Sequence, residues 1–306
     1  PNRQASFTPS APGKWYICTI LAGALRPGPT LKNGIMFTYL DPTVRQRLIA
    51  NGKLVCVRHD GQATPPDSDL SDDAKALSVL GPIPLPVDCG AREYLVDWYA
   101  SVRHTRLNMV EDMAERCRQD RKLEAFAGLS ASMAVNSVLV VGEPKEWENP
   151  LIRIHSCCLT GDVFGSKRCE CGPQFRTAMA RIAEDPAGGM LIYMSGHEGR
   201  GIGLWAKAAT YLLQDSGENT YQANQSLGLP DDSRDFSDAA ILIKYFLGNR
   251  PFRLLTNNPK KIEDLEAAGL TNVTRVKHVV GVSSNNRRYL SAKQKWGHDI
   301  DASDLS

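Results

Sequence analysis

The 306 residues carry 36 basic and 34 acidic side chains, and 42% of them are hydrophobic. This hydrophobic fraction allows a buried core, whereas a formal charge of +2 excludes an overall field that would attract nucleic acid or an anionic membrane. No run approaches the roughly 18 apolar residues that cross a bilayer, and the first residues lack a signal-peptide pattern. We therefore expect a cytoplasmic globular protein with no membrane or nucleic-acid partner.

Residues 1–130 form the first predicted region, an N-terminal extension of unknown role in which we find no chemical motif. Turn formers such as "DGQATPPDSDLSDD" separate short apolar runs such as "WYICTILAG" and "KLVCVRH", which predicts short strands. One long helix is expected over residues 92–129, because apolar residues recur there at helical spacing with charges between them. We interpret Arg103, His104 and Arg106 in this stretch as a solvated face.

Residues 131–306 form the second predicted region, in which strand and helix patterns alternate. This alternation predicts a mixed α/β (α+β) domain built of layers. The expected strands cover residues 135–143, 151–158, 188–196 and 252–258, and the expected helices cover residues 173–185, 204–217 and 259–270.

Four of the eight cysteines lie close together, and Cys158, Cys169 and Cys171 have the spacing C-x10-C-x-C. Three thiolates without an obvious fourth ligand suit a catalytic zinc ion, which keeps one position open for water, better than a structural zinc ion. Buried or redox-active thiols are the alternative on spacing alone. Because neighbouring strand residues point to opposite faces, Cys157 would point away from the ligands. The other cysteines are interpreted as core or incidental residues: Cys18, Cys56, Cys89 and Cys117.

Two strand-to-helix junctions are candidate anion sites. In "SGHEGRGIGLWAKAA" a glycine turn leads into a helix, so backbone N–H groups and Arg200 could hold a phosphate. In "LTNNPKK" Lys260 and Lys261 stand in the first turn of a helix, where cations are unfavourable unless an anion is bound. A simple turn and a pair of solvated lysines are the respective alternatives.

The loop "GLPDDSRDF" carries clustered charges that include Asp232 and Arg234. Such a cluster is commonly a solvated turn. Beside a metal and a phosphate, the same residues would supply a base and a guanidinium group.

Taken together, these stretches resemble the GTP cyclohydrolase II family, zinc enzymes that open the imidazole ring of GTP on the way to riboflavin. The similarity covers about residues 134–300 and rests on "RIHSCCLTGDVFGSKRCECGPQ", "HEGRGIGLWAKAATYLLQD", "TYQANQSLG", "DDSRDF", "LLTNNPKK" and "NNRRYLSAKQKWGH" in that order. The resemblance implies a homodimeric hydrolase that acts on cyclic amidine C–N bonds. Its products would be formate, pyrophosphate and a diaminopyrimidinone ribosylamino phosphate.

The resemblance also implies residue roles. The three cysteines of the C-x10-C-x-C motif would hold one Zn²⁺ per chain, and Mg²⁺ on the nucleotide phosphates would fit the release of pyrophosphate. Asp232 aligns with the family's proton acceptor, Arg234 with the residue that attacks the α-phosphorus, and Tyr211 with a tyrosine of the ring chemistry. The family's GTP-contacting positions fall on Arg153, His155, Ser156, Gln174, Glu198, Gly199, Arg200, Thr220, Thr256 and Lys261.

Three features depart from the family pattern. Cys157 stands where the family usually has Glu, and His197 stands where it usually has Gln. Bifunctional relatives carry a dihydroxybutanone-phosphate synthase in their N-terminal part, but residues 1–130 lack its acidic loops, so we do not assign that second activity.

These departures keep alternatives open. A related cyclohydrolase that opens a uracil nucleotide such as UMP would use the same machinery. A catalytically silent nucleotide-binding regulator is a second alternative, although Asp232, Arg234 and the cysteines are all present. A zinc-stapled nucleic-acid module is disfavoured by the missing fourth ligand and the near-neutral charge.

Overall fold

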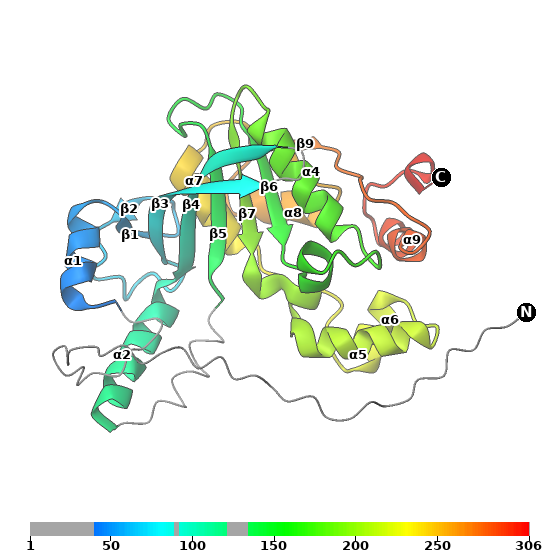
Figure 1. Cartoon of the computed structure of the whole chain (residues 1–306), viewed down its shortest axis with the longest axis horizontal. Helices are drawn as coiled ribbons and strands as arrows, with labels where there is room; N and C mark the ends of the chain where they lie inside the picture. The colour runs from blue at the N-terminus through cyan, green and yellow to red at the C-terminus, as the bar shows by residue number, and fades with distance from the viewer. Residues whose placement is uncertain (1–39, 89–91, 121–133, 306) are drawn as a thin grey trace, which may run out of the picture. The chain divides into compact units, whose positions relative to one another are not determined.

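The computed structural model describes residues 40–88, 92–120 and 134–305, which belong to one compact unit. The described strands build one nine-stranded sheet in the order β2-β1-β3-β4-β5-β7-β6-β8-β9 (Figure 1). The strands are β1 (Leu54–Val57), β2 (Ala63–Thr64), β3 (Leu77–Asp88), β4 (Glu93–Arg103), β5 (Asn136–Val141), β6 (Leu151–Ser156), β7 (Gly189–Met194), β8 (Phe252–Leu255) and β9 (Val273–Val276).

Helices lie on both faces of this sheet and beyond one of its ends (Figure 1). The α-helices are α1 (Pro42–Ala50), α2 (His104–Asp120), α4 (Cys171–Ala183), α5 (Gly203–Asp215), α6 (Thr220–Ser226), α7 (Ser237–Leu247), α8 (Pro259–Ala267) and α9 (Arg287–Lys295). Short helical turns are η1 (Leu159–Val163), η2 (Ser195–Gly201) and η3 (Ala302–Leu305). Within the described residues, no helix has the length and apolar composition needed to span a bilayer.

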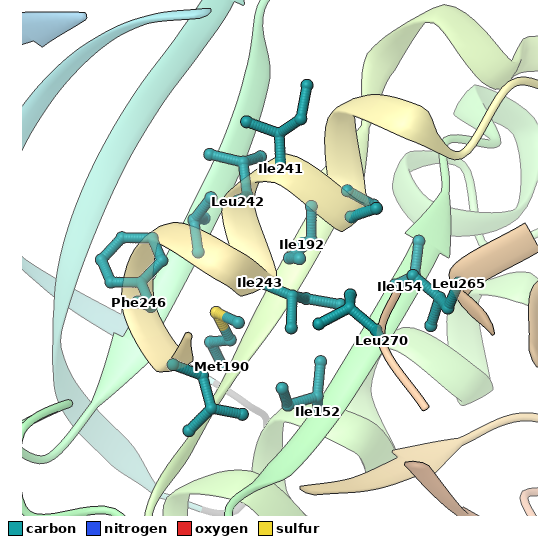
Figure 2. Packing of buried hydrophobic residues seen from close by; sticks show 14 of the residues in the cluster. Ile152, Ile154, Met190, Ile192, Ile241, Leu242, Ile243, Phe246, Leu265 and Leu270 are labelled. Atoms are coloured by element: carbon teal, nitrogen blue, oxygen red, sulfur yellow. The ribbon is translucent and has the colours of Figure 1, made fainter. Parts of the chain in front are cut away.

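The two faces of the central strand β6 carry different side chains. Ile152 and Ile154 of β6 are fully buried against the apolar helix α7 (Figure 2). Side chains alternate along a strand, so Arg153 and His155, the next residues after each isoleucine, point to the other face. Helix α4 packs on that face. This alternation keeps the apolar core on one face and leaves polar side chains for a site on the other.

Strands β6, β7, β8 and β9 are parallel, so their carboxyl ends lie at one edge of the sheet. In open α/β sheets, ligands bind beyond this edge. The segments that follow β6, β7 and β8 carry the predicted zinc, glycine-turn and lysine motifs. The topology therefore brings three distant sequence motifs to one place.

The helix expected over residues 92–129 is wrong in its first part. Residues Glu93–Arg103 form strand β4, which pairs antiparallel with β3 and β5, and the helix begins only at His104. The segment also has a period of two, since Tyr94, Val96 and Trp98 all pack toward the α4 side of the sheet. Hydrogen bonding of this segment to β3 and β5 selected the strand period of two over the helical period. Residues 121–129 of the expected helix lie outside the described residues.

The outer halves of β3 and β4 form a two-stranded ribbon that covers α4 (Figure 1). Val87 and Val96 pack in the same apolar cluster as α4, and the Tyr94 hydroxyl donates to Glu184 Oε1 at 3.0 Å. The sheet thus contains strands from both sides of residue 130, where the sequence pattern changes to alternating strands and helices. A division of function at that point remains a prediction.

The expected mixed α/β architecture is confirmed, and each strand and helix expected after residue 131 is present within a few residues of its expected bounds. Helices α6, α7 and α9 and strand β9 were not predicted. Cys56 is fully buried, as expected for a core thiol. The "WYICTILAG" segment, Cys18, Cys89 and the Cys117 side chain lie outside the described residues.

Candidate active site

The three predicted ligands form a thiol cluster at the carboxyl edge of the sheet. The sulfur atoms of Cys158, Cys169 and Cys171 all lie within 4.8 Å of one another, and those of Cys158 and Cys169 are 3.7 Å apart. Zinc–sulfur bonds of about 2.3 Å in a tetrahedron place two sulfurs about 3.8 Å apart, so this donor set fits zinc. Among the described residues, no fourth His, Cys, Asp or Glu belongs to the cluster.

A buried carboxylate holds the loop that carries this cluster. Asp162 accepts hydrogen bonds from the Cys158 backbone N–H at 3.0 Å and the Tyr193 hydroxyl at 3.0 Å, and its carboxylate lies 3.1 Å from His155 Nε2. Burial lowers the pKa of His155. The sequence reading assigned no role to Asp162 or Tyr193, whose contribution depends on contacts between separate strands and loops.

Gly161 is required where the loop passes the sulfur atoms. An added Cβ would lie 2.8 Å from Cys169 Sγ, 2.9 Å from Cys171 Cβ and 3.2 Å from Cys158 Sγ. Backbone atoms can approach the thiols this closely only when residue 161 has no side chain.

We expect Gly161→Ala to weaken zinc binding about 10- to 100-fold, because overpacking costs roughly 1–3 kcal/mol and here displaces the ligands. Chelator competition would measure the zinc affinity. Gly165→Ala in the same loop is the control, since its Cβ would meet nothing within 4 Å and only its φ of +66° is strained. Equal zinc affinity of Gly161→Ala and wild-type protein would contradict the prediction.

Lys207 is a cation beside the thiol cluster that the sequence reading missed. Its ammonium group donates to Cys158 Sγ at 3.1 Å and to Glu198 Oε1 at 2.5 Å, and the side chain is buried. Hydrogen bonds from the Cys169 and Cys171 thiols, together with Lys207, lower the pKa of Cys158. A signal existed, since Lys207 is the only charged residue in the otherwise apolar stretch "IGLWAKAATYLL".

Cys157 points away from the cluster, as expected. Its thiol donates to the Ser195 carbonyl oxygen at 3.2 Å, and burial raises its pKa to about 12. Cys157 is therefore a protonated neighbour of the ligands.

Glu198 ties the glycine turn after β7 to the loop that carries the thiol cluster. Its Oε2 accepts from the Leu159 backbone N–H at 2.7 Å, while Lys207 occupies the other oxygen. Gly199 and Arg200 both have left-handed φ angles, of 59° and 64°. The Arg200 guanidinium lies 4.2 Å over the ring of Tyr221. Glu198 thus bonds to protein groups, which favours a structural role over the predicted contact with substrate.

Two buried cations have no carboxylate partner among the described residues. Arg153 donates to the Leu255 carbonyl at 2.7 Å and to Gln174 Oε1 at 2.8 Å, and Lys261 donates only to the Ile154 carbonyl at 2.8 Å. Burial lowers the pKa of Arg153 to about 10 and that of Lys261 well below its usual value. Cations held in this way favour an anionic ligand.

The loop "DDSRDF" brings the predicted base and guanidinium group together. Arg234 Nε and Nη2 donate to the two carboxylate oxygens of Asp232 at 2.8 and 2.5 Å, and Nη1 lies 3.4 Å from Ser156 Oγ. Although burial opposes it, the hydrogen bonds and charge of Arg234 lower the pKa of Asp232. Asp232 is therefore ionised at neutral pH.

His197, one of the departures, anchors the same loop. Its Nε2 lies 3.0 Å from the Asp235 carbonyl, which can only accept, so Nε2 carries the proton. Burial lowers the pKa of His197 to about 4, so the ring is neutral and Nδ1 accepts from the Ser156 hydroxyl at 3.2 Å. His197 therefore joins Ser156 to the exit of the Arg234 loop.

Two buried histidines predict acid sensitivity of the fold. Burial lowers the pKa of both His197 and His278 to about 4, whereas an unfolded histidine titrates near about 6.5. Between these values the unfolded chain binds more protons, so stability is complete above about pH 6.5 and falls as the pH is lowered toward 4.

His278→Gln should therefore make this decline shallower by at most about 1.4 kcal/mol per pH unit. Urea unfolding at several pH values would measure it. Parallel stability curves for the variant and the wild-type protein would contradict the assignment.

Nearly all predicted site residues line one pocket at the carboxyl edge. Asp232 contacts this pocket only through Arg234, and Thr220 is the first residue of α6 with its side chain outside the described residues. The predicted residues that line the pocket are Arg153, His155, Ser156, Cys158, Cys169, Cys171, Gln174, Glu198, Gly199, Arg200, Tyr211, Arg234, Thr256 and Lys261.

The C-terminal segment closes the pocket and was not assigned residues from the sequence. Tyr289, Lys293 and His298 all line it, and Lys293 forms a buried ion pair with Glu170 at 2.5 Å. Burial lowers the pKa of His298 to about 3. The motif "NNRRYLSAKQKWGH" contained these residues, but only the fold showed that they line the same pocket as the thiol cluster.

Fold and site together define a class of α/β protein in which three clustered cysteines that could hold a metal ion line one pocket with buried basic side chains. The chain belongs to the GTP cyclohydrolase II family, whose model matches residues 110–277, more than half of the chain.

The chain is similar to curated proteins of riboflavin biosynthesis. It is 50% identical over 163 residues to the riboflavin biosynthesis protein RibBA of Mycolicibacterium paratuberculosis. The aligned residues cover 53% of this chain and 38% of the relative. It is 48% identical over 167 residues to the protein of the same name from Mycobacterium marinum. This alignment covers 54% of this chain and 39% of the relative. The chain thus spans less than two fifths of the length of these relatives.

Proposed function

We propose that the chain is a zinc-dependent GTP cyclohydrolase II, which releases formate and pyrophosphate from GTP. The observation that carries this proposal is the shared pocket of Cys158, Cys169, Cys171 and the carboxylate-free cations Arg153 and Lys261. Family membership and similarity to riboflavin biosynthesis proteins support it.

In this proposal the three cysteines hold the metal, and bound zinc supplies a Lewis acid that activates water at neutral pH. The Tyr211 hydroxyl bonds to Thr160 Oγ1 at 3.1 Å, beside the ligand Cys158. Burial raises the pKa of Tyr211, so its hydroxyl keeps its proton and can donate it to the ring being opened.

Arg153, Lys261 and Arg200 would bind the triphosphate, since phosphate oxygens supply the negative charge that their surroundings lack. Mg²⁺ would accompany the phosphates. By the family pattern, Arg234 would attack the α-phosphorus, and pyrophosphate would leave as the N–P bond forms. Asp232, 2.5 Å from Nη2, would accept the guanidinium proton, and water would later cleave the N–P bond. A homodimer and a cytoplasmic location remain predictions.

Metal analysis of the purified protein, followed by mass spectrometry of products from GTP and, separately, UMP, tests the proposal. About one zinc per chain with formate and a diaminopyrimidine from GTP would support it. Zinc with intact GTP and an opened UMP ring would replace it with a uracil-nucleotide hydrolase. Zinc with tight nucleotide binding but no turnover of either substrate would indicate a silent regulator.

A further inference from the structure

We infer that Arg103, from the N-terminal half of the chain, is a positioning residue for Arg234. The inference rests on the proposed function, because the position of Arg234 matters for pyrophosphate release. Arg103 lies outside the residues matched by the family model, in a region whose role the sequence did not reveal. It was expected on a solvated face, which is wrong, since its side chain is only 16% exposed.

Arg103 is the last residue of β4, and its guanidinium group faces the segment directly after Arg234. Nη2 forms an ion pair with Asp238 Oδ1 at 2.5 Å, donates to Ser237 Oγ at 2.8 Å, and lies 3.7 Å from Asp235 Oδ2. One guanidinium group thus contacts three of the four residues that follow Arg234.

These three residues form the junction between the Arg234 loop and helix α7. Asp235 accepts from the Ser237 backbone N–H at 2.9 Å and from its hydroxyl at 2.8 Å, which ties it to the first residue of the helix. Asn136 of β5 donates to Asp238 Oδ2 at 3.1 Å. The neighbouring strands β4 and β5 therefore hold the start of α7 from the sheet side.

Removal of Arg103 would leave Asp235 and Asp238 near each other without their cation. Burial and the charge of Asp235 both raise the pKa of Asp238, and the charge of Arg103 is the largest effect that opposes them. The junction would rearrange to let water reach the Asp238 carboxylate, which is only 16% exposed. Because Arg234 is adjacent to Asp235, its guanidinium group would move relative to the pocket.

Two further contacts show why the junction matters for the loop. The other end of the loop is held by the Ser233 N–H, which donates to the Arg200 carbonyl at 3.0 Å, and the Asp235 carbonyl bonds to His197. Arg103 supplies a second side-chain restraint at the exit, beside His197. A displacement of about 1 Å at a reacting group can reduce a rate about 100-fold.

The test uses Arg103→Met in the full chain. We expect kcat for pyrophosphate release from GTP to fall about 10- to 100-fold while KM and zinc content change little, because Arg153, Lys261 and the cysteines are untouched. Hydrogen exchange should accelerate in peptides covering residues 231–238 and stay slow in the core of α7. Arg103→Lys should recover part of the activity through its charge.

Arg45→Met is the matched control. Arg45 also forms one ion pair at 2.5 Å, with Asp67, and its side chain is 24% exposed, but its ion-pair partner lies outside residues 231–238. Equal losses of kcat in Arg45→Met and Arg103→Met would overturn the inference, as would unchanged exchange of residues 231–238. If Arg103→Met does not fold, Asp238→Asn removes the same pair and must show the same loss of kcat.

A double variant separates positioning from a general loss of stability. If Arg103 acts through Asp238, Arg103→Met combined with Asp238→Asn should lose no more kcat than Arg103→Met alone, whereas additive losses would overturn the inference. Failure of the proposed function would look different. The wild-type protein would then leave GTP intact, while the exchange experiment would still report whether Arg103 orders the loop.

Discussion

Cys169→Ser should lose bound zinc and the ring-opening activity together, while the domain stays folded. Cys169 contributes one of only three sulfur ligands, and a serine hydroxyl is a poor zinc ligand at neutral pH. Changes in the outer shell of zinc sites already cost about 10- to 100-fold in affinity, so loss of a ligand should cost more. The fold should survive because its larger core cluster lies on the opposite face of the sheet, around α7.

Metal analysis after gel filtration and formate release from GTP would measure the two losses, and circular dichroism would check the fold. Cys157→Ser is the matched control, because Cys157 is the sequence neighbour of a ligand but bonds to the Ser195 carbonyl. It should keep its zinc. Retention of stoichiometric zinc by Cys169→Ser would show that the thiol cluster is not the metal site.

Lys261→Met should weaken nucleotide binding strongly and at the same time stabilise the fold. The ammonium group of Lys261 is buried with one carbonyl partner, and burial together with Arg153 and Arg234 lowers its pKa. An apolar side chain of similar length removes this unfavourable burial, which should add about 1 kcal/mol, or roughly 2–4 °C in Tm. Loss of a charge-assisted contact to phosphate should raise KM for GTP by about 10-fold or more.

The adjacent residue provides the control. Lys260 is 46% exposed and pairs with Asp264 at 2.6 Å on the surface of α8. Lys260→Met should change neither KM nor Tm appreciably. Similar KM values for both lysine variants would show that Lys261 does not contact the phosphates, and a lower Tm for Lys261→Met would show that its buried contact is stabilising.

Much of the structure after residue 131 could be predicted from local patterns. The alternation of apolar runs and amphipathic segments after residue 131 identified its central strands and helices, because period and capping residues are local properties. The spacing of Cys158, Cys169 and Cys171 identified the thiol cluster for a similar reason. These ligands come from one loop and the start of the helix that follows it, so little tertiary information was needed.

Residues that act across the fold were missed. Lys207 has the sequence context of a packing residue, and only the meeting of α5 with the loop of the thiol cluster places its ammonium group on Cys158. Asp162 and Tyr193 meet because a loop after β6 folds over β7. In each case the informative contact joins segments whose separation in sequence carries no signal.

What the sequence alone determined is the chemistry available: three thiols at ligand spacing, a glycine turn, a lysine-bearing helix start and a paired Asp and Arg. Only the tertiary structure decided which of these groups share a pocket and what holds them there. Residues 93–103 have both helical and strand periodicity, and hydrogen bonding to β3 and β5 selected the strand. That selection carries Arg103 from an apparent solvated face to the exit of the Arg234 loop, because a strand in a sheet fixes the position of its last residue relative to distant segments.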